Sequence, residues 1–139
     1  FHPKLPIVYC DDEKGDSVTA YKLDRYTGQL KAFHTVSTIP AVFDGSKNTC
    51  ADIEISADGK FIYASNRGHN SIAGFAVDAN TGKLNRIGQF DTGETPRSFN
   101  LGPNDNWLIA AGQRSHDLHI YERNAKSGKL AKLHKQKTG

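Results

Sequence analysis

Short apolar segments alternate with turn residues along the whole chain, and apolar residues do not recur with the period of a helix. Four such segments stand between residues 50 and 95, at Ile53 and Ile55, Phe61–Ser65, Ser71–Val77 and Leu84–Phe90. Alternation with a period of two is typical of β-strands, and the mostly apolar run Phe61–Ser65 is typical of a strand that is covered on both faces. This region therefore predicts four short strands and no helix.

Turn residues separate the predicted strands. Asp58-Gly59 is a two-residue hairpin signal between the first and second strands. A polar bend, Arg67–Asn70, follows the second strand, and Thr81-Gly82 turns the chain between the third and fourth. The pattern predicts an antiparallel meander.

The same pattern occurs three times. The segment that starts at Phe61 matches the segments that start at Ile7 and Trp107, so the spacings are 54 and 46 residues. The landmarks shared by the copies are an apolar triplet, a polar bend, an alternating run and a Thr/Ser-Gly-x-Leu turn. The longer spacing has a source in the insertion Phe43–Thr49, which has the composition of a loop.

Four-stranded units that recur every 40–50 residues or so are typical of a β-propeller. The sequence thus predicts an all-β fold, a partial propeller made of four-stranded antiparallel blades, with one domain over residues 1–139 and copies at about 1–49, 50–95 and 96–139. Closed propellers have about four to eight blades. Because three blades cannot close a ring, we expect further blades or self-association to cover the two open blade faces.

Composition narrows the class of protein. Hydrophobic residues make up 37% and charged residues 24% of the 139 residues, as in an ordinary globular domain. No apolar run is long enough to cross a bilayer, and the formal net charge of +3 is too small to indicate nucleic-acid binding. The chain begins at Phe1 and contains no Met, so we expect it to be a piece of a longer protein.

The two cysteines, Cys10 and Cys50, form neither a disulfide framework nor a zinc-binding pattern. We expect both to be small apolar side chains in or near strands, in a protein from a reducing compartment. The sequence predicts no metal and no cofactor.

The topology of the meander locates a candidate site. The bend after the second strand of a blade and the connection into its first strand share one face, whereas the Asp-Gly and Thr-Gly turns lie on the opposite face. The bends of successive copies should therefore gather around one mouth of the central channel. The connections Asn48–Asp52 and Thr95–Ser98 should lie there too.

Equivalent positions of the three bends carry Glu13, Arg67 and Gln113, an acid, a base and an amide. Turn chemistry alone would favour similar residues in all three copies. Arg97, which follows Pro96, should face the same mouth. Since guanidinium groups match phosphate and carboxylate oxygens, we predict that Arg67 and Arg97 hold an anion and that Glu13 acts as a general base.

Two neighbours of Arg67 extend the candidate site: Asn66 precedes it, and His69 lies just beyond it. Each candidate also has a purely structural interpretation. Arg67 would bridge blades through a carboxylate such as Glu13, and Arg97 would be a strand-entry residue on a solvated rim. The acidic run that contains Glu13 is typical of a solvated turn, and His69 would be a bend residue.

Three segments together resemble a known family: Asn66–Ile72, Thr81–Leu84 and Pro96–Phe99. They are similar to the lactonase family of seven-bladed propellers, which includes propeller-type 6-phosphogluconolactonases and carboxy-muconate lactonizing enzymes. The resemblance covers essentially the whole chain and implies about three of seven blades, from the C-terminal portion of the family.

The resemblance implies a cytoplasmic enzyme that acts on a small anionic lactone without a metal. Glu13, Arg67 and Arg97 match the Glu and the two Arg of the family's motifs, although the family's Asn-Glu-Leu bend reads Asp12-Glu13-Lys14 here. Hydrolysis of a sugar lactone, 6-phosphoglucono-δ-lactone first, is the expected activity, with Arg67 and Glu13 catalytic and Arg97, Asn66, His69 and Gln113 binding the substrate. The alternatives are a muconate-type lactonizing cycloisomerase and a non-catalytic propeller that binds protein partners.

Overall fold

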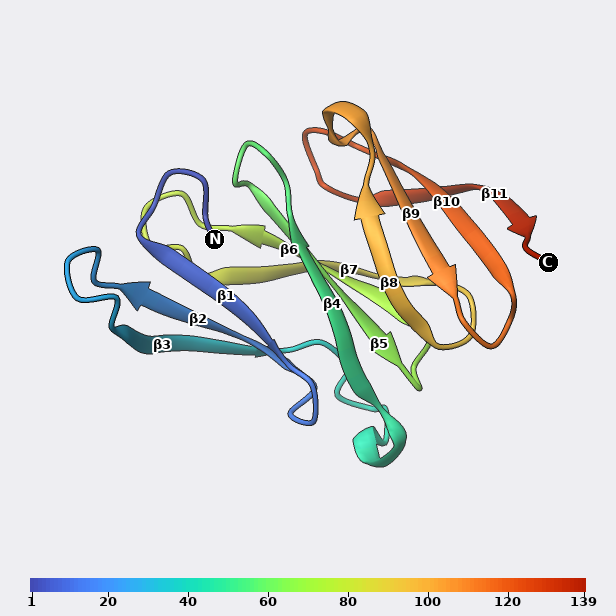
Figure 1. Ribbon diagram of the computed structural model, residues 1–139, viewed down its shortest axis with the longest axis horizontal. Helices are drawn as coiled ribbons and strands as arrows, with labels where there is room; N and C mark the ends of the chain where they lie inside the picture. Colours follow the sequence, from blue (N-terminus) through green and yellow to red (C-terminus); the bar gives the residue numbers. More distant parts are fainter.

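The computed structural model describes residues 1–139 and contains three antiparallel sheets that lie side by side (Figure 1). The first sheet contains β1 (Ile7–Asp12), β2 (Ser17–Leu23) and β3 (Leu30–Ser37). The second contains β4 (Thr49–Ile55), β5 (Phe61–Arg67), β6 (Ser71–Val77) and β7 (Leu84–Asp91). The third contains β8 (Pro96–Leu101), β9 (Trp107–Gly112), β10 (Asp117–Arg123) and β11 (Leu130–Lys137). The all-β prediction of a partial propeller is thus confirmed.

The first sheet has three strands, because the positions that correspond to β4, 54 residues upstream of Thr49–Ile55, fall almost entirely before residue 1. Its strands β1, β2 and β3 correspond to β5, β6 and β7, and it has no counterpart of β4. Residues 1–6 form the turn that corresponds to the β4–β5 connection: the His2 amide donates to the Ile7 carbonyl, as the Ser56 amide does to the Phe61 carbonyl, and His2 Nδ1 accepts from the Leu5 amide at 2.8 Å.

The connection between β4 and β5 lies where it was predicted but is longer than a two-residue hairpin loop. Ser56 still pairs with Phe61, since its amide donates to the Phe61 carbonyl at 2.9 Å, so residues 57–60 form the loop. Asp58 fills this loop by accepting from the Ser56 hydroxyl and the Lys60 amide. Gly59 has a φ of +77°, which a residue without a Cβ adopts readily.

Neighbouring sheets pack face to face through a repeated contact. Tyr9 of the first sheet is buried and donates its hydroxyl to the Gly82 carbonyl of the second sheet at 2.7 Å. Tyr63, at the equivalent position of the second sheet, donates to the Gly128 carbonyl of the third sheet at 2.6 Å. Each tyrosine thus pins one sheet to the Thr/Ser-Gly turn of the next, and the apolar core consists of the two clusters that lie between the sheets.

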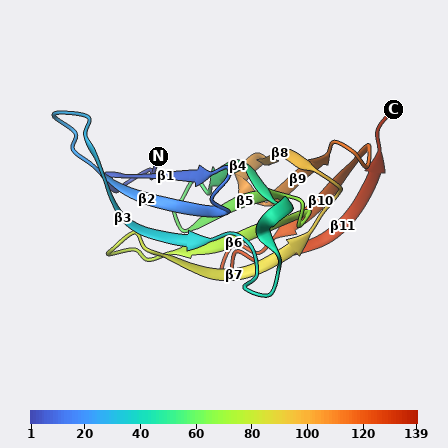
Figure 2. The same ribbon diagram turned by 90° about the horizontal axis from the view of Figure 1, so that it is seen from below.

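The bends and the turns lie at opposite ends of the strands. In Figure 1 the bends after β1, β5 and β9 and the short 3₁₀ helix η1 (Gly45–Lys47) lie along the lower edge, with the turns at the upper and left edges. A second 3₁₀ helix, η2 (Pro103–Asp105), lies between β8 and β9. Seen from below, β4 and β8 follow one long edge of the array, and β3, β7 and β11 follow the other (Figure 2).

The outer face of the third sheet carries apolar side chains. Leu108 and Ala110 point toward the second sheet and are buried, whereas Trp107 and Ile109, one residue out of phase, remain 42% and 40% exposed. The position that holds the pinning tyrosine in the other two sheets is Ile109 here. No helix in the structure has both the length and the apolar character needed to cross a membrane.

Candidate functional site

The bends of the first two sheets and the start of β8 enclose a polar hollow of about 340 Å³, which we call the mouth hollow. Its lining residues are Asp11, Glu13, Cys50, Ala51, Arg67 and Arg97. The structure therefore brings Glu13, Arg67 and Arg97 together from three different sheets, as the topological argument predicted. What each of them does for a substrate is still a prediction.

Arg67 stands at the end of β5, between the first and second sheets. Its Nη2 donates to Glu13 Oε1 at 2.5 Å and to the Cys50 carbonyl at 2.9 Å. Its Nε is buried and has no hydrogen-bond partner. The Arg67 side chain is 19% exposed and that of Glu13 is 65% exposed. The predicted bridge between blades therefore exists, and Nη1, which makes no hydrogen bond, remains a free donor of Arg67.

The bend that follows Arg67 is held by the insertion before β4. Gly68 has a φ of +120°, and a Cβ at this position would lie 2.4 Å from the Lys47 carbonyl oxygen. Asn48, which is buried, accepts from the His69 amide and donates to Asp16 Oδ1 at 2.7 Å. Only glycine allows the bend to approach the insertion this closely, and the contact fixes the direction in which β5 delivers Arg67.

Arg97 reaches the mouth hollow because β8 contains a β-bulge. Pro96 pairs with Gly112 and Ser98 with Ala111, so Arg97 is the extra residue between them. A similar irregularity in β4 places Ala51 at the equivalent point of the second sheet. A bulge re-aims a side chain next to a site. Arg97 is exposed and has no ion pair or hydrogen bond within the protein, so its guanidinium is free for an anion.

Asp11 also lines the mouth hollow, although the sequence suggested only a solvated acidic turn there. It follows Ile7 and Tyr9 with a period of two, and this alternation was the signal that it faces the second sheet. Burial, together with the charges of Asp52, Asp12 and Glu13, raises the pKa of Asp11. The Asp11 carboxylate makes no hydrogen bond or ion pair with another side chain, so it can exchange a proton with a bound molecule.

A second polar hollow of about 550 Å³ adjoins the first, and Glu13 and Arg67 line both. We call it the outer hollow. Gln113 lines it, and the backbone amide of Gln113 donates to the Thr95 carbonyl. Lys47 and Arg114 add positive charge, and Glu94 lies 3.9 Å from Arg114. The Arg67–Glu13 pair therefore separates two hollows at the same mouth.

Two predicted substrate-binding residues lie outside both hollows. Asn66 is fully buried; its Oδ1 accepts from the Thr38 hydroxyl at 2.8 Å, and its Nδ2 donates to the Thr38 carbonyl at 3.0 Å. The His69 ring packs edge-on against Phe43, with centroids 4.7 Å apart, and its Nδ1 lies 2.8 Å from Ser71 Oγ. In this structure both side chains hold the bend and line neither hollow, so a substrate-binding role for Asn66 and His69 stays a prediction.

The mouth residues suit acid–base chemistry on an anion better than thiol chemistry. Burial raises the pKa of the Cys50 thiol to about 11, which keeps it protonated and a poor nucleophile at neutral pH. Cys10 is exposed on β1 and does not line the hollow. No group of three or more His, Cys, Asp and Glu side chains is placed to hold a metal ion. The ionisable side chains that line the mouth hollow with Cys50 are two guanidinium groups and two carboxylates.

Comparison with known proteins gives consistent matches along the chain. The sequence model of the family described as "Lactonase, 7-bladed beta-propeller" matches residues 1–139. A 6-phosphogluconolactonase of Pectobacterium carotovorum is 33% identical over 139 residues, which are all of this chain and 42% of the relative. This chain thus spans about two-fifths of the length of that relative.

Solved structures agree with the sequence matches. A crystal structure of a protein from Lactobacillus plantarum superposes with a TM-score of 0.94 at 37% identity, over 99% of this chain and 40% of that one. The periplasmic gluconolactonase PpgL of Pseudomonas aeruginosa superposes with a TM-score of 0.89 at 28% identity, over 96% of this chain and 37% of that one. Both similarities extend over all three sheets.

Proposed function

Since this chain belongs to the lactonase family of seven-bladed β-propellers, we propose that it supplies part of the active site of an enzyme that hydrolyses a sugar lactone. The observation that carries the proposal is the mouth hollow, where two arginines and two carboxylates from separate sheets meet. The relative named 6-phosphogluconolactonase and the structure named gluconolactonase support the same reaction class.

Two arginines bind the substrate in this proposal. The free guanidinium of Arg97 holds an anionic or carbonyl oxygen of the lactone, and the unpaired Nη1 of Arg67 stabilises the negative charge that develops on the carbonyl oxygen. Donors that are already oriented stabilise such charge effectively, because they do not reorganise during the reaction. Glu13 and the Cys50 carbonyl provide this orientation for Arg67 by accepting from its Nη2.

The carboxylates move protons. Glu13 shares only Oε1 with Arg67, so its other oxygen takes a proton from the attacking water while the water oxygen bonds to the lactone carbonyl carbon. The tetrahedral intermediate then breaks its bond to the ring oxygen. Asp11, whose pKa is raised by burial and by the neighbouring carboxylates, gives a proton to that leaving oxygen. The product is the open-chain hydroxy acid, and the two carboxyl groups exchange protons with solvent before the next turnover.

We propose 6-phosphoglucono-δ-lactone as the substrate. A phosphate carries more charge than one arginine neutralises, and the outer hollow supplies Lys47 and Arg114 beside Arg67. A substrate that spans the Arg67–Glu13 pair would place its lactone ring in the mouth hollow and its phosphate in the outer hollow. Lys47→Gln should then raise KM for the phosphorylated lactone while leaving KM for glucono-δ-lactone unchanged; an equal change for both lactones contradicts this placement.

The test of lactone hydrolysis uses the protein with its natural flanking sequence. Arg67→Ala and Glu13→Gln should each lower kcat/KM for lactone hydrolysis by about 100-fold or more, since each removes a group that acts in the transition state. Lys14→Gln, at the neighbouring position of the bend and outside both hollows, is the matched control and should keep the wild-type value. If both site variants keep wild-type kcat/KM, the proposed function is wrong.

A further inference from the structure

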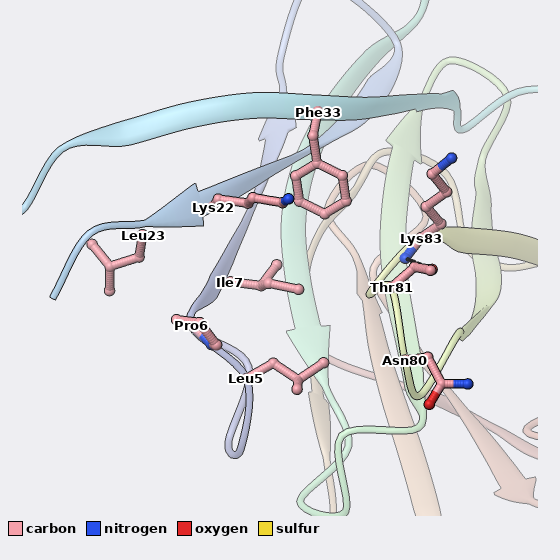
Figure 3. Close-up of a pocket in the computed structure, with 9 residues that line it drawn as sticks. All are labelled: Leu5, Pro6, Ile7, Lys22, Leu23, Phe33, Asn80, Thr81 and Lys83. Carbon is pink, nitrogen blue, oxygen red and sulfur yellow. Dashed lines mark hydrogen bonds between the residues drawn. The ribbon is translucent and has the colours of Figure 1, made fainter.

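A pocket of about 590 Å³ lies between the first and second sheets, at the end of the strands that carries the turns (Figure 3). We call it the turn-side pocket. Its apolar wall consists of Leu5, Ile7 and Phe33, and the turn before β7 faces this wall with Thr81 and Lys83. The mouth hollow is lined by residues of the bends at the other end of the strands, so the two share no lining residue.

The repeat explains why this pocket is open. In the packing of the second sheet against the third, the equivalents of Ile7 and Val77 are Phe61 and Arg123, and the Arg123 guanidinium lies 5.6 Å from the centre of the Phe61 ring. Phe61 is 5% and Arg123 is 6% exposed, so they fill the space between those sheets. Between the first and second sheets, the smaller Ile7 lines the pocket, and the smaller Val77 packs against the same apolar cluster as Ile7 without lining the pocket itself.

The charged side chains that line the pocket are both positive: Lys22 and Lys83. The Lys22 ammonium lies 5.8 Å from the centre of the Phe33 ring, and Lys83 stands across the pocket on the turn (Figure 3). None of the nine lining residues is acidic. An apolar wall with a few polar groups that fix orientation is the usual make-up of a small-molecule site, and the volume lies within the range of such sites.

We propose that the turn-side pocket binds an aromatic carboxylate. The aromatic ring packs against Leu5, Ile7 and Phe33, and the carboxylate pairs with the Lys22 ammonium, while Lys83 on the facing turn adds a second positive charge. A neutral apolar molecule would leave both ammonium groups without a partner, and a small inorganic anion would leave the apolar wall exposed to water. The site differs from the lactone site in place and in chemistry, so the proposal does not depend on the proposed function.

The test measures binding of 2-naphthoate, followed by its fluorescence, to the protein with its natural flanking sequence. The double variant Ile7→Phe/Val77→Arg rebuilds the filled packing found between the second and third sheets. We expect this variant to remain folded, with a Tm near that of the wild type, and to weaken 2-naphthoate binding by about tenfold or more. Lys22→Gln, which leaves the apolar wall intact, keeps the proposal testable if the double variant does not fold, and should weaken binding about threefold.

Matched controls identify the site. Lys83→Gln should weaken binding about threefold, whereas Lys129→Gln, the equivalent lysine of the next turn, should have no effect. Neutral 2-naphthalenemethanol should bind more weakly than 2-naphthoate. Arg67→Ala should bind 2-naphthoate as the wild type does, which excludes the mouth hollow as the site. Absence of saturable binding, equal binding of the neutral analogue, or unchanged binding to the filled variant would each overturn the proposal.

Discussion

The chain contains two charged clusters near the same ends of its strands, and they are built in opposite ways. At the mouth, Glu13 is 65% exposed, and the donors of Arg67 are only partly used. At the start of β10, the Asp117 side chain is fully buried; it accepts from the Ser115 hydroxyl at 2.6 Å and pairs with Lys135 at 2.9 Å. The first cluster keeps binding capacity for a molecule from solution, whereas the second directs its charges at one another.

The Asp117 cluster shows what a structural use of charge looks like in this fold. Burial alone would raise the pKa of Asp117, but the hydrogen bonds from Ser115 and Lys135 outweigh burial and lower the pKa to about 2. Burial, followed by the nearby Lys132 charge, lowers the pKa of the neighbouring His119. The folded state therefore keeps Asp117 ionised and His119 neutral, and it excludes water from both.

The largest expected difference between the clusters is in catalysis. Arg97→Ala should lower kcat/KM for lactone hydrolysis about 100-fold, because a free guanidinium in the mouth hollow is removed. The Tm should stay close to the wild-type value, since Arg97 makes no contact that holds the fold. Asp117→Asn should leave kcat/KM of the folded protein unchanged. Steady-state kinetics and thermal melts on both variants measure these effects. A large loss of activity in Asp117→Asn would contradict a purely structural role for the Asp117 cluster.

A smaller difference is expected in stability. Asp117→Asn should lower the free energy of unfolding by about 2 kcal/mol, because the buried partners of a charged acceptor lose strong hydrogen bonds. The matched control is Glu94→Gln, which weakens an exposed pair with Arg114 and should cost less than about 0.5 kcal/mol. Denaturant unfolding measures both changes in the free energy of unfolding. Equal decreases for the two variants would mean that the burial of Asp117 adds no stability to its contacts.

The smallest effect should appear in the pH dependence of stability. The pKa of His119 is lower in the folded state than the ordinary value of 6.5, so the unfolded state binds the proton more tightly. Stability should therefore fall as the pH drops below 6.5, before Asp117 begins to contribute below its ordinary pKa of 3.8. His119→Gln should flatten the curve between pH 7 and 5. An unchanged slope in this variant would show that other groups cause the loss.

Most of the fold could be predicted from local pattern. The alternation in Ser71–Val77 and the continuous apolar run from Phe61 correspond to β6 and β5, and the Thr81-Gly82 turn lies where the sequence places it. These features depend on neighbours within a few residues, because the period of side chains along a strand is local. The fourth strand expected in the first copy corresponds to positions before residue 1, so that expectation stays a prediction.

The candidate site was predicted in outline and corrected in detail. Because topology places successive bends at one mouth, Glu13 and Arg67 were expected near each other, and they form an ion pair. Asn66 and His69 share the same bend, yet their side chains turn into the protein and hold it in place. Whether a bend residue points into the hollow or away from it depends on its contacts with the insertion before β4, which no local pattern describes.

What the amino-acid order determined by itself is the blade: strand length, turn positions and the repeat that stacks one sheet beside the next. The tertiary structure decided which side chains face a common space. Arg97 enters the mouth hollow because a bulge shifts the pairing of β8, and Asp11 enters it because the first sheet packs against β4. Both depend on how separate sheets rest on one another, and this is set by contacts between residues that are far apart in the chain.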